Sequence, residues 1–235
     1  MGGATRPAAH LRPGNAVGDL PPRVDRWARR AGRCPAAVDC SPTAGCESQS
    51  PGNTGPMAYE SPAYEVERRI DDVEIRRYEP YVVAETFVQA SLESAGNGGF
   101  RRLAGYIFGG NETTDGDSTK IAMTTPVTQD RVGDEFRVRF MMPSEYDLET
   151  LPNPRDGRVA LARVGAQRLG AIRYSGRWSA SGFEHHLDHL RTRLEANGYA
   201  PVGEPIWARY DPPWKPWFLR RNEVLLPIEA DTGAG

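Results

Sequence analysis

Apolar and polar residues begin to alternate at residue 64, which predicts β-strands over the following part of the chain. The runs YEVERRI (64–70) and VEIRRYE (73–79) place apolar residues at every second position. Asp71-Asp72 lies between them, as expected for a tight hairpin turn. The run VVAETFVQA (82–90) predicts a third strand.

A helical period follows Asn97-Gly98-Gly99. In FRRLAGYIF (100–108) the apolar residues fall on one stripe at helical spacing, and Gly109-Gly110 predicts the end of the helix. Two further strands are predicted at KIAMTTPVTQ (120–129) and EFRVRFMMP (135–143), with a turn between them.

The second half of the chain repeats this order. Strands are predicted at 159–164 and 169–178, and Ser179 or Ser181 can cap a helix that runs to about Asn197. Its apolar stripe consists of Phe183, Leu187, Leu190 and Leu194. Two strands, PIWARYD and NEVLLPI, close the region, so strand-helix-strand-strand occurs at 82–142 and again at 169–228.

Each repeat leaves one helix and one sheet with an apolar face to bury. Joining the two sheets buries both faces. The predicted fold class is therefore α+β, with an antiparallel sheet of about eight strands curled into a distorted barrel and two helices packed on it.

The first 56 residues have a different composition and are predicted to be a disordered leader or tail. They are rich in Pro, Gly, Ala, Ser and Arg and carry seven Arg against four acidic residues, whereas residues 57–235 have a net charge of −5. A transit peptide remains an alternative for this Arg-rich segment, and Met57 could be the true start. The chain has no signal-peptide pattern and no long apolar run, which favours the cytoplasm and no membrane contact.

Metal and catalytic motifs are not apparent. Cys34, Cys40 and Cys46 are spaced too widely for a zinc site, and all lie in the leader. His185 and His189 are one helical turn apart, but both fall opposite the apolar stripe and lack a third ligand. No hydrolase, nucleotide-binding or metalloprotease motif occurs, so we expect no metal site and no enzymatic activity. The net charge of −2 gives no reason to expect nucleic acid as a partner.

Two segments hold the most distinctive chemistry: KIAMTTPV (120–127) and YDPPWKPWFLRRNEVLL (210–226). Of 29 cationic residues only Lys120 and Lys215 are lysines, and one falls in each segment. The second segment combines three prolines with aromatic residues and cations, which fits a rigid apolar surface for a planar dianion. An aromatic lid on the core is the alternative reading.

In the order of YIFGGN, KIAMTTPV, YDPPWKP and RRNEVLL, the chain resembles the SOUL/heme-binding protein family from about Tyr64 to Ile228. The resemblance implies a pseudo-twofold duplication of a β-α-β-β unit. It also implies non-covalent binding of heme or protoporphyrin IX at a cleft between the first helix and the YDPPWKP loop. The residues expected to bind the tetrapyrrole are Arg101, Tyr106, Phe108, Lys120, Met123, Trp214, Lys215, Trp217 and Arg220.

These features lead us to expect a cytoplasmic, monomeric, non-enzymatic tetrapyrrole carrier, buffer or sensor formed by residues 57–235. One alternative is a small-molecule effector-binding module of the gyrase-inhibitor-like type, which would place its pocket inside the curled sheet, often with a central Glu. Another is an enzyme acting on heme or a hydrophobic small molecule, for which an inward-facing carboxylate with a raised pKa would be the sign.

Overall fold

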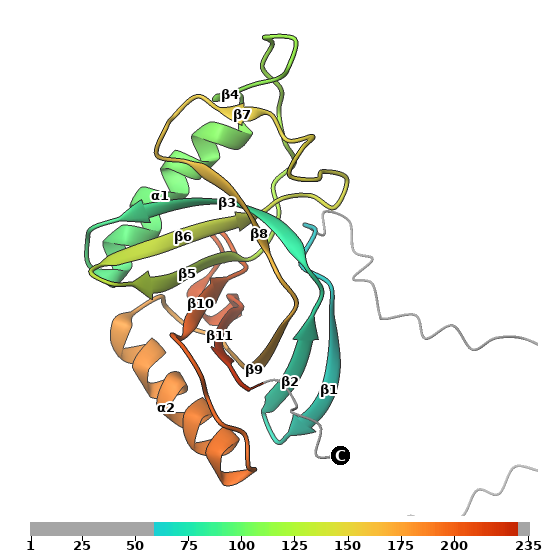
Figure 1. The fold of residues 1–235 in the computed structure, drawn as a ribbon. Helices are drawn as coiled ribbons and strands as arrows, with labels where there is room; N and C mark the ends of the chain where they lie inside the picture. Colours follow the sequence, from blue (N-terminus) through green and yellow to red (C-terminus); the bar gives the residue numbers. More distant parts are fainter. Residues whose placement is uncertain (1–58, 230–235) are drawn as a thin grey trace, which may run out of the picture. The chain divides into compact units, whose positions relative to one another are not determined.

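The computed structural model describes residues 59–229 (Figure 1). The predictions for residues 1–56, for the three cysteines and for Met57 lie outside the described residues.

A large antiparallel sheet dominates the described residues. Nine strands pair in the order β1-β2-β9-β11-β10-β5-β6-β3-β8, and the sheet curls into a half-barrel (Figure 1). These strands are β1 (Tyr64–Ile70), β2 (Val73–Tyr78), β3 (Tyr81–Val88), β5 (Val127–Val132), β6 (Glu135–Met141), β8 (Ala160–Val164), β9 (Gln167–Tyr174), β10 (Ile206–Arg209) and β11 (Asn222–Pro227). The short strands β4 (Asn111–Glu112) and β7 (Asn153–Pro154) form a separate pair. The helices are α1 (Leu92–Ile107) and α2 (Ala180–Ala196), and η1 (Trp217–Leu219) is a single 3₁₀ turn.

The sheet order confirms the duplicated unit. One half is β3-α1-β5-β6 and the other is β9-α2-β10-β11, and within each half the strands pair in the same relative order. The halves meet where β5 pairs with β10. One further strand extends each half of the sheet. β2 precedes the first half in the chain and pairs with β9 of the second half, and β8 precedes the second half and pairs with β3 of the first.

The two faces of the sheet differ in chemistry. The helix-facing side is apolar: α2 buries Phe183, Leu187, Leu190 and Leu194, as predicted, against Val224 and its neighbours. The concave side carries charged and phenolic side chains. Strand alternation produces both faces at once, because residues that pair across strands share a face and their neighbours in the chain point the other way.

Helix α1 begins earlier than predicted. It starts at Leu92, with the Ser91 side chain accepting from the Ser94 N–H as an N-cap, and passes through Gly98 and Gly99. The glycines are tolerated because the helix approaches β6 closely: a Cβ on Gly99 would lie 2.5 Å from Val138 Cγ2. The helix therefore needs glycine at that point, where sequence patterns suggested a helix start.

The strand predicted at 120–129 is also shorter than expected. β5 begins at Val127, and residues 120–126 hydrogen-bond outside the sheet ladder. Thr124 Oγ1 donates to Met141 O at 2.6 Å, and Thr125 N donates to Glu60 O at 2.8 Å. Pro126 has no N–H to offer a ladder, so the sheet starts after it.

We expect Gly99→Ala to destabilise the protein by about 1–3 kcal/mol, because the added methyl group overlaps Val138. Gly105→Ala is a matched control in the same helix, since a Cβ there meets nothing within 4 Å. It should stabilise by about 0.5–1 kcal/mol through helix propensity. Urea unfolding midpoints measure both. Equal effects of the two substitutions would contradict the close packing of α1 on β6.

Candidate functional site

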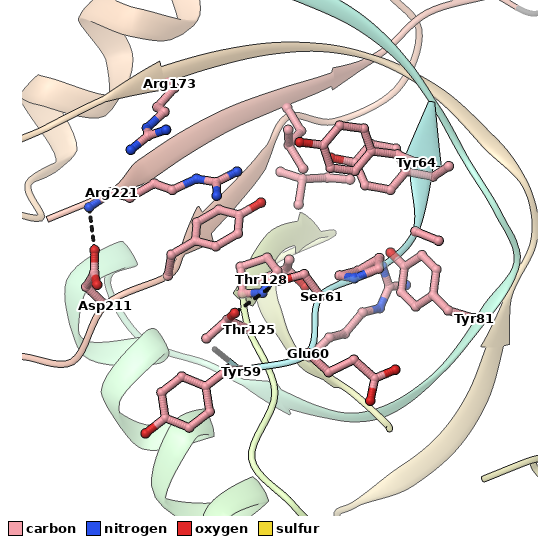
Figure 2. A pocket seen from close by; sticks show the side chains of 18 of the residues that line it. Tyr59, Glu60, Ser61, Tyr64, Tyr81, Thr125, Thr128, Arg173, Asp211 and Arg221 are labelled. Atoms are coloured by element: carbon pink, nitrogen blue, oxygen red, sulfur yellow. Dashed lines mark hydrogen bonds between the residues drawn. The ribbon is translucent and has the colours of Figure 1, made fainter. Parts of the chain in front are cut away.

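A cavity of about 970 Å³ lies on the concave side of the half-barrel (Figure 2). Its wall is rich in phenolic rings: Tyr59, Tyr64, Tyr78, Tyr81 and Tyr210. Four cations, Arg139, Arg173, Lys215 and Arg221, also line it, against the two acidic residues Glu60 and Asp211. The lining therefore has an excess of positive charge.

Small side chains lie beneath the residues that line the cavity. On the concave face, Ala208 pairs with Glu223 on one side and with Thr128 on the other. Ala171 on β9 also has a small side chain facing inward, where it pairs with Leu225. Both alanines are buried in one cluster with Tyr78, Leu169 and Leu225, and these three larger side chains line the cavity.

A segment before β1 forms one wall of the cavity. Residues 59–63 all line it, and the Ser61 and Thr125 hydroxyls lie 3.2 Å apart (Figure 2). Glu60 accepts the Thr125 N–H with its carbonyl at 2.8 Å and the Ser144 N–H with Oε1 at 2.9 Å. These contacts hold residues 59–63 against two other parts of the chain: the segment after α1, at Thr125, and the segment after β6, at Ser144.

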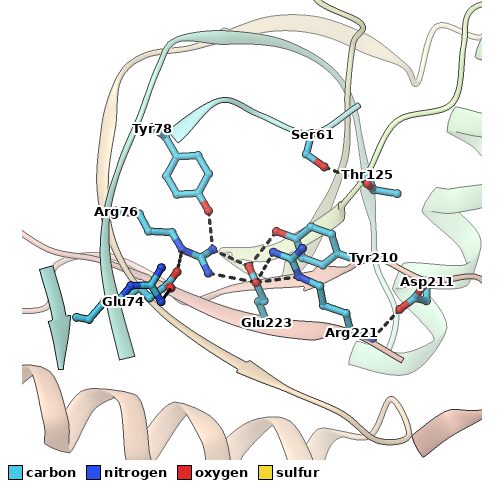
Figure 3. Close-up of polar contacts among 10 residues, drawn as sticks. Ser61, Glu74, Arg76, Tyr78, Thr125, Tyr210, Asp211, Arg221 and Glu223 are labelled. Carbon is cyan, nitrogen blue, oxygen red and sulfur yellow. Dashed lines mark hydrogen bonds and ion pairs between the residues drawn. The ribbon is translucent and has the colours of Figure 1, made fainter. Parts of the chain in front are cut away.

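Beneath the cavity, Glu223 is fully buried and is paired with two arginines (Figure 3). Arg76 donates to Oε2 at 2.8 Å and to Oε1 at 3.2 Å, and Arg221 donates to Oε1 at 2.7 Å. The Tyr210 hydroxyl donates to Oε2 at 2.9 Å, and Arg76 also donates to the Tyr78 hydroxyl at 3.1 Å. A buried carboxylate requires this degree of pairing.

The pKa values of this cluster follow from that pairing. Burial alone would raise the pKa of Glu223, but the hydrogen bonds and charges of Arg76 and Arg221 outweigh it and lower the pKa. Burial raises the pKa of Tyr78, Tyr81 and Tyr210. At neutral pH the carboxylate is therefore ionised, and the three phenols remain protonated.

The loop between β10 and β11 (211–220) is held by its own polar groups. Lys215 donates to Asp211 Oδ1 at 2.7 Å, and Asp211 Oδ2 accepts the Arg221 N–H at 2.6 Å. Burial tends to raise the pKa of Asp211, but these hydrogen bonds lower it overall. Arg220 donates to the carbonyls of Lys215 and Pro213. The loop is therefore rigid, and the charge of Arg220 serves its internal structure.

Arg173 differs from the other lining cations. Arg139 pairs with Glu85, Lys215 with Asp211 and Arg221 with Glu223. Within residues 59–229, no hydrogen bond or ion pair reaches the side chain of Arg173. It pairs with Glu223 in the sheet register, and Figure 2 shows it on the same side of the cavity as Arg221.

The nine residues predicted from the sequence are distributed over two regions. Lys215 lines the cavity, Arg220 braces the loop, and Trp214 and Trp217 are exposed on that loop. The other five belong to α1 or to the chain between α1 and β5, and none lines this cavity: Arg101, Tyr106, Phe108, Lys120 and Met123. The role of all nine as tetrapyrrole contacts stays a prediction.

Those five residues have separate environments. Arg101, Phe108 and Lys120 are exposed, and Met123 packs, half-buried, on an apolar cluster under α1. Tyr106 is buried and donates its hydroxyl to Pro152 O at 2.9 Å; burial raises its pKa to about 12. Tyr106 therefore already has a structural partner.

Sequence reasoning missed Arg173 and Glu223. In LGAIRYSGRW and NEVLLPI both residues alternate with core residues, which places them on the face of the strand opposite the helices. That alternation could have identified them. It could not show that Arg76 and Arg221 neutralise Glu223, because those residues come together only in the folded sheet.

No helix in residues 59–229 is long and apolar enough to cross a membrane. Within the same part of the chain, His, Cys, Asp and Glu nowhere gather in groups of three or more that could hold a metal ion.

Comparison with known proteins gives a family and a fold. The family model described as SOUL heme-binding protein matches residues 59–227. No curated protein matches the chain.

Among solved structures, an EcmrR–DNA complex has 11% identity and a TM-score of 0.51, covering 67% of this chain and 57% of that one. The EcmrR C-terminal domain has 11% identity and a TM-score of 0.48 over 71% and 98%. A hydrolase from Listeria innocua has 11% identity and a TM-score of 0.48 over 67% and 92%. At this identity, the EcmrR–DNA complex shows similarity of fold alone.

We expect Glu223→Gln to destabilise the protein by about 3 kcal/mol at neutral pH, because it leaves Arg76 and Arg221 without their buried anion. A group with a lowered folded pKa contributes stability above its unfolded pKa, here 4.5, and loses it as the pH falls through the folded value. At pH values below about 4.5 the stability of the wild-type protein should therefore fall, and the stability of the variant should fall less.

Urea midpoints measured at neutral and acidic pH test this expectation. Glu195→Gln, which changes an exposed carboxylate on α2, is the control and should leave both midpoints near wild type. A Glu223→Gln variant as stable as wild type at neutral pH would show that the buried ion pairs do not hold the sheet together.

Proposed function

We propose that this chain, which belongs to the SOUL heme-binding protein family, binds a dianionic tetrapyrrole such as heme or protoporphyrin IX non-covalently in the concave cavity. The cavity volume, about 970 Å³, is near the upper end of the range for small-molecule pockets, roughly 300–1,000 Å³. A planar macrocycle needs a pocket of this size.

The observation that carries the proposal is the uncompensated charge of Arg173. A tetrapyrrole carboxylate at the cavity wall would give this guanidinium the anionic partner that residues 59–229 do not supply. Lys215 and Arg221 line the same cavity and could receive the second carboxylate, although each already has an acidic partner. Glu223 pairs with both Arg76 and Arg221, so among the lining cations Arg173 is the one without an acidic partner within residues 59–229.

Aromatic and aliphatic groups would contact the macrocycle. Tyr64 and Tyr81 face the cavity across from Arg173 and Arg221 (Figure 2), and Leu219, Pro126 and Ile206 add apolar surface. Tyrosine rings can stack on a planar ligand, while their protonated hydroxyls donate hydrogen bonds. In this proposal the residues described here supply apolar contact and point charges, and iron is not required for binding.

A second candidate function is a sensor for a different anionic aromatic molecule. It is favoured by the location of the cavity inside the curled sheet above a central glutamate, which is the arrangement expected for an effector-binding module. Glu223 faces inward, but its pKa is lowered, whereas a carboxylate acting as an acid catalyst would have a raised pKa. We therefore assign it an electrostatic role beneath the ligand.

We expect Arg173→Ala to weaken protoporphyrin IX binding by on the order of 1 kcal/mol, the scale of a partly exposed charge-assisted hydrogen bond. Absorbance or fluorescence titration measures the affinity. Arg191→Ala, an exposed arginine on α2, is the matched control and should bind as wild type does. With the dimethyl ester of protoporphyrin, Arg173→Ala and wild type should bind equally.

Equal affinity of Arg173→Ala and wild type for the free acid would contradict the proposed placement. Tight binding of a different anionic aromatic compound, together with no binding of either porphyrin, would favour the sensor function.

A further inference from the structure

The loop at 211–220 has an outward surface that the cavity does not use. Four of the ten exposed large apolar side chains in residues 59–229 occur within six consecutive positions of this loop: Trp214, Trp217, Phe218 and Leu219. Of these only Leu219 lines the cavity. We call Trp214, Trp217 and Phe218 the aromatic face; Trp214 is 81% exposed and Phe218 58%.

This surface is preorganised. Pro212, Pro213 and Pro216 restrict the backbone, and Arg220 bonds two loop carbonyls from inside. Trp217 and Phe218 pack edge to face with ring centroids 5.6 Å apart, and Gly176 N donates to Trp217 O at 3.2 Å. Exposed aromatic groups held in place in this way are typical of a docking surface.

Cations lie beside the aromatic face: Arg177 is exposed, whereas Lys215 and Arg220 are half-buried. The Arg177 guanidinium lies over the Trp217 ring, 5.8 Å from its centroid, and Lys215 and Arg220 come from the same loop. Asp211 is the acidic residue of the loop, and Lys215 neutralises it. Tryptophan and phenylalanine beside arginine and lysine fit the boundary of a bilayer with negatively charged headgroups.

We propose that the aromatic face docks the protein on an anionic phospholipid surface. Tetrapyrroles partition into membranes, and Lys215 and Leu219 connect the aromatic face to the cavity. If the proposed function holds, docking would bring the cavity mouth to the membrane surface. The sequence predicted no membrane contact because it has no long apolar run, whereas this proposal rests on a local group of aromatic residues and cations.

Charge also argues against two other occupants. Residues 1–56 carry seven Arg against four acidic residues, so this segment would bring like charge to the surface. A second copy docked symmetrically through the same face would bring a second set of the same cations into one interface. An anionic surface complements both the rings and the cations.

The test is co-sedimentation of the full chain with vesicles, without porphyrin. One set is phosphatidylcholine alone, and the other contains phosphatidylcholine and phosphatidylglycerol in equal amounts. We expect binding to the anionic vesicles to be at least about tenfold tighter. The double variant Trp214→Ser/Phe218→Ser should lose at least about tenfold of that binding. Phe108→Ser, which removes an aromatic residue 61% exposed at the end of α1, should bind like wild type.

A lipid-free titration with protoporphyrin IX separates this inference from the proposed function. We expect the double variant to bind the porphyrin as wild type does, whereas the sequence-based prediction that Trp214 stacks on the ring requires weaker binding. Weaker porphyrin binding with unchanged vesicle binding would overturn the inference and make the aromatic face part of the ligand site. The inference would also be overturned if the wild-type protein did not bind anionic vesicles, or if it self-associated through these residues.

Discussion

The pairing of Glu223 with Arg76 and Arg221 is the constraint on which the concave side of the sheet depends. A fully buried carboxylate is costly unless its charge and lone pairs are satisfied. Here Arg76 from β2 and Arg221 beside β11 meet it, with Tyr210 as a third donor. These contacts join strands that are not adjacent in sequence. Within residues 59–229 they also leave Arg173, the register partner of Glu223, without an acidic partner of its own.

Much of the fold could be predicted because local pattern and tertiary packing agree. The hairpin at Asp71-Asp72, the cap at Ser179 and the stripe of α2 all follow from residue types within a short window. The predicted start of α1 was wrong because Gly99 allows the helix to lie close to Val138, a contact that only the folded sheet reveals. Residues 120–126 were wrong as strand because their polar groups bond to Glu60 and Met141, which are distant in sequence.

The site was less predictable than the fold. Lys215 was singled out by composition, and it lines the cavity; Arg173 looked like one of many exposed arginines. The family resemblance led us to expect an apolar cleft between α1 and the YDPPWKP loop, and this stays a prediction. The cavity lies on the opposite side of the sheet from α1 and is lined by tyrosine and arginine. The loop at 211–220 belongs both to the expected cleft and to the observed cavity. Lys215 and Leu219 line the cavity, whereas Trp214 and Phe218 do not.

A crystal structure of the full chain with protoporphyrin IX tests the central claim most directly. We expect the macrocycle in the concave cavity, with a carboxylate oxygen about 2.7–3.2 Å from the Arg173 guanidinium. A porphyrin bound along α1 beside Arg101 and Phe108, with the cavity unchanged, would contradict it.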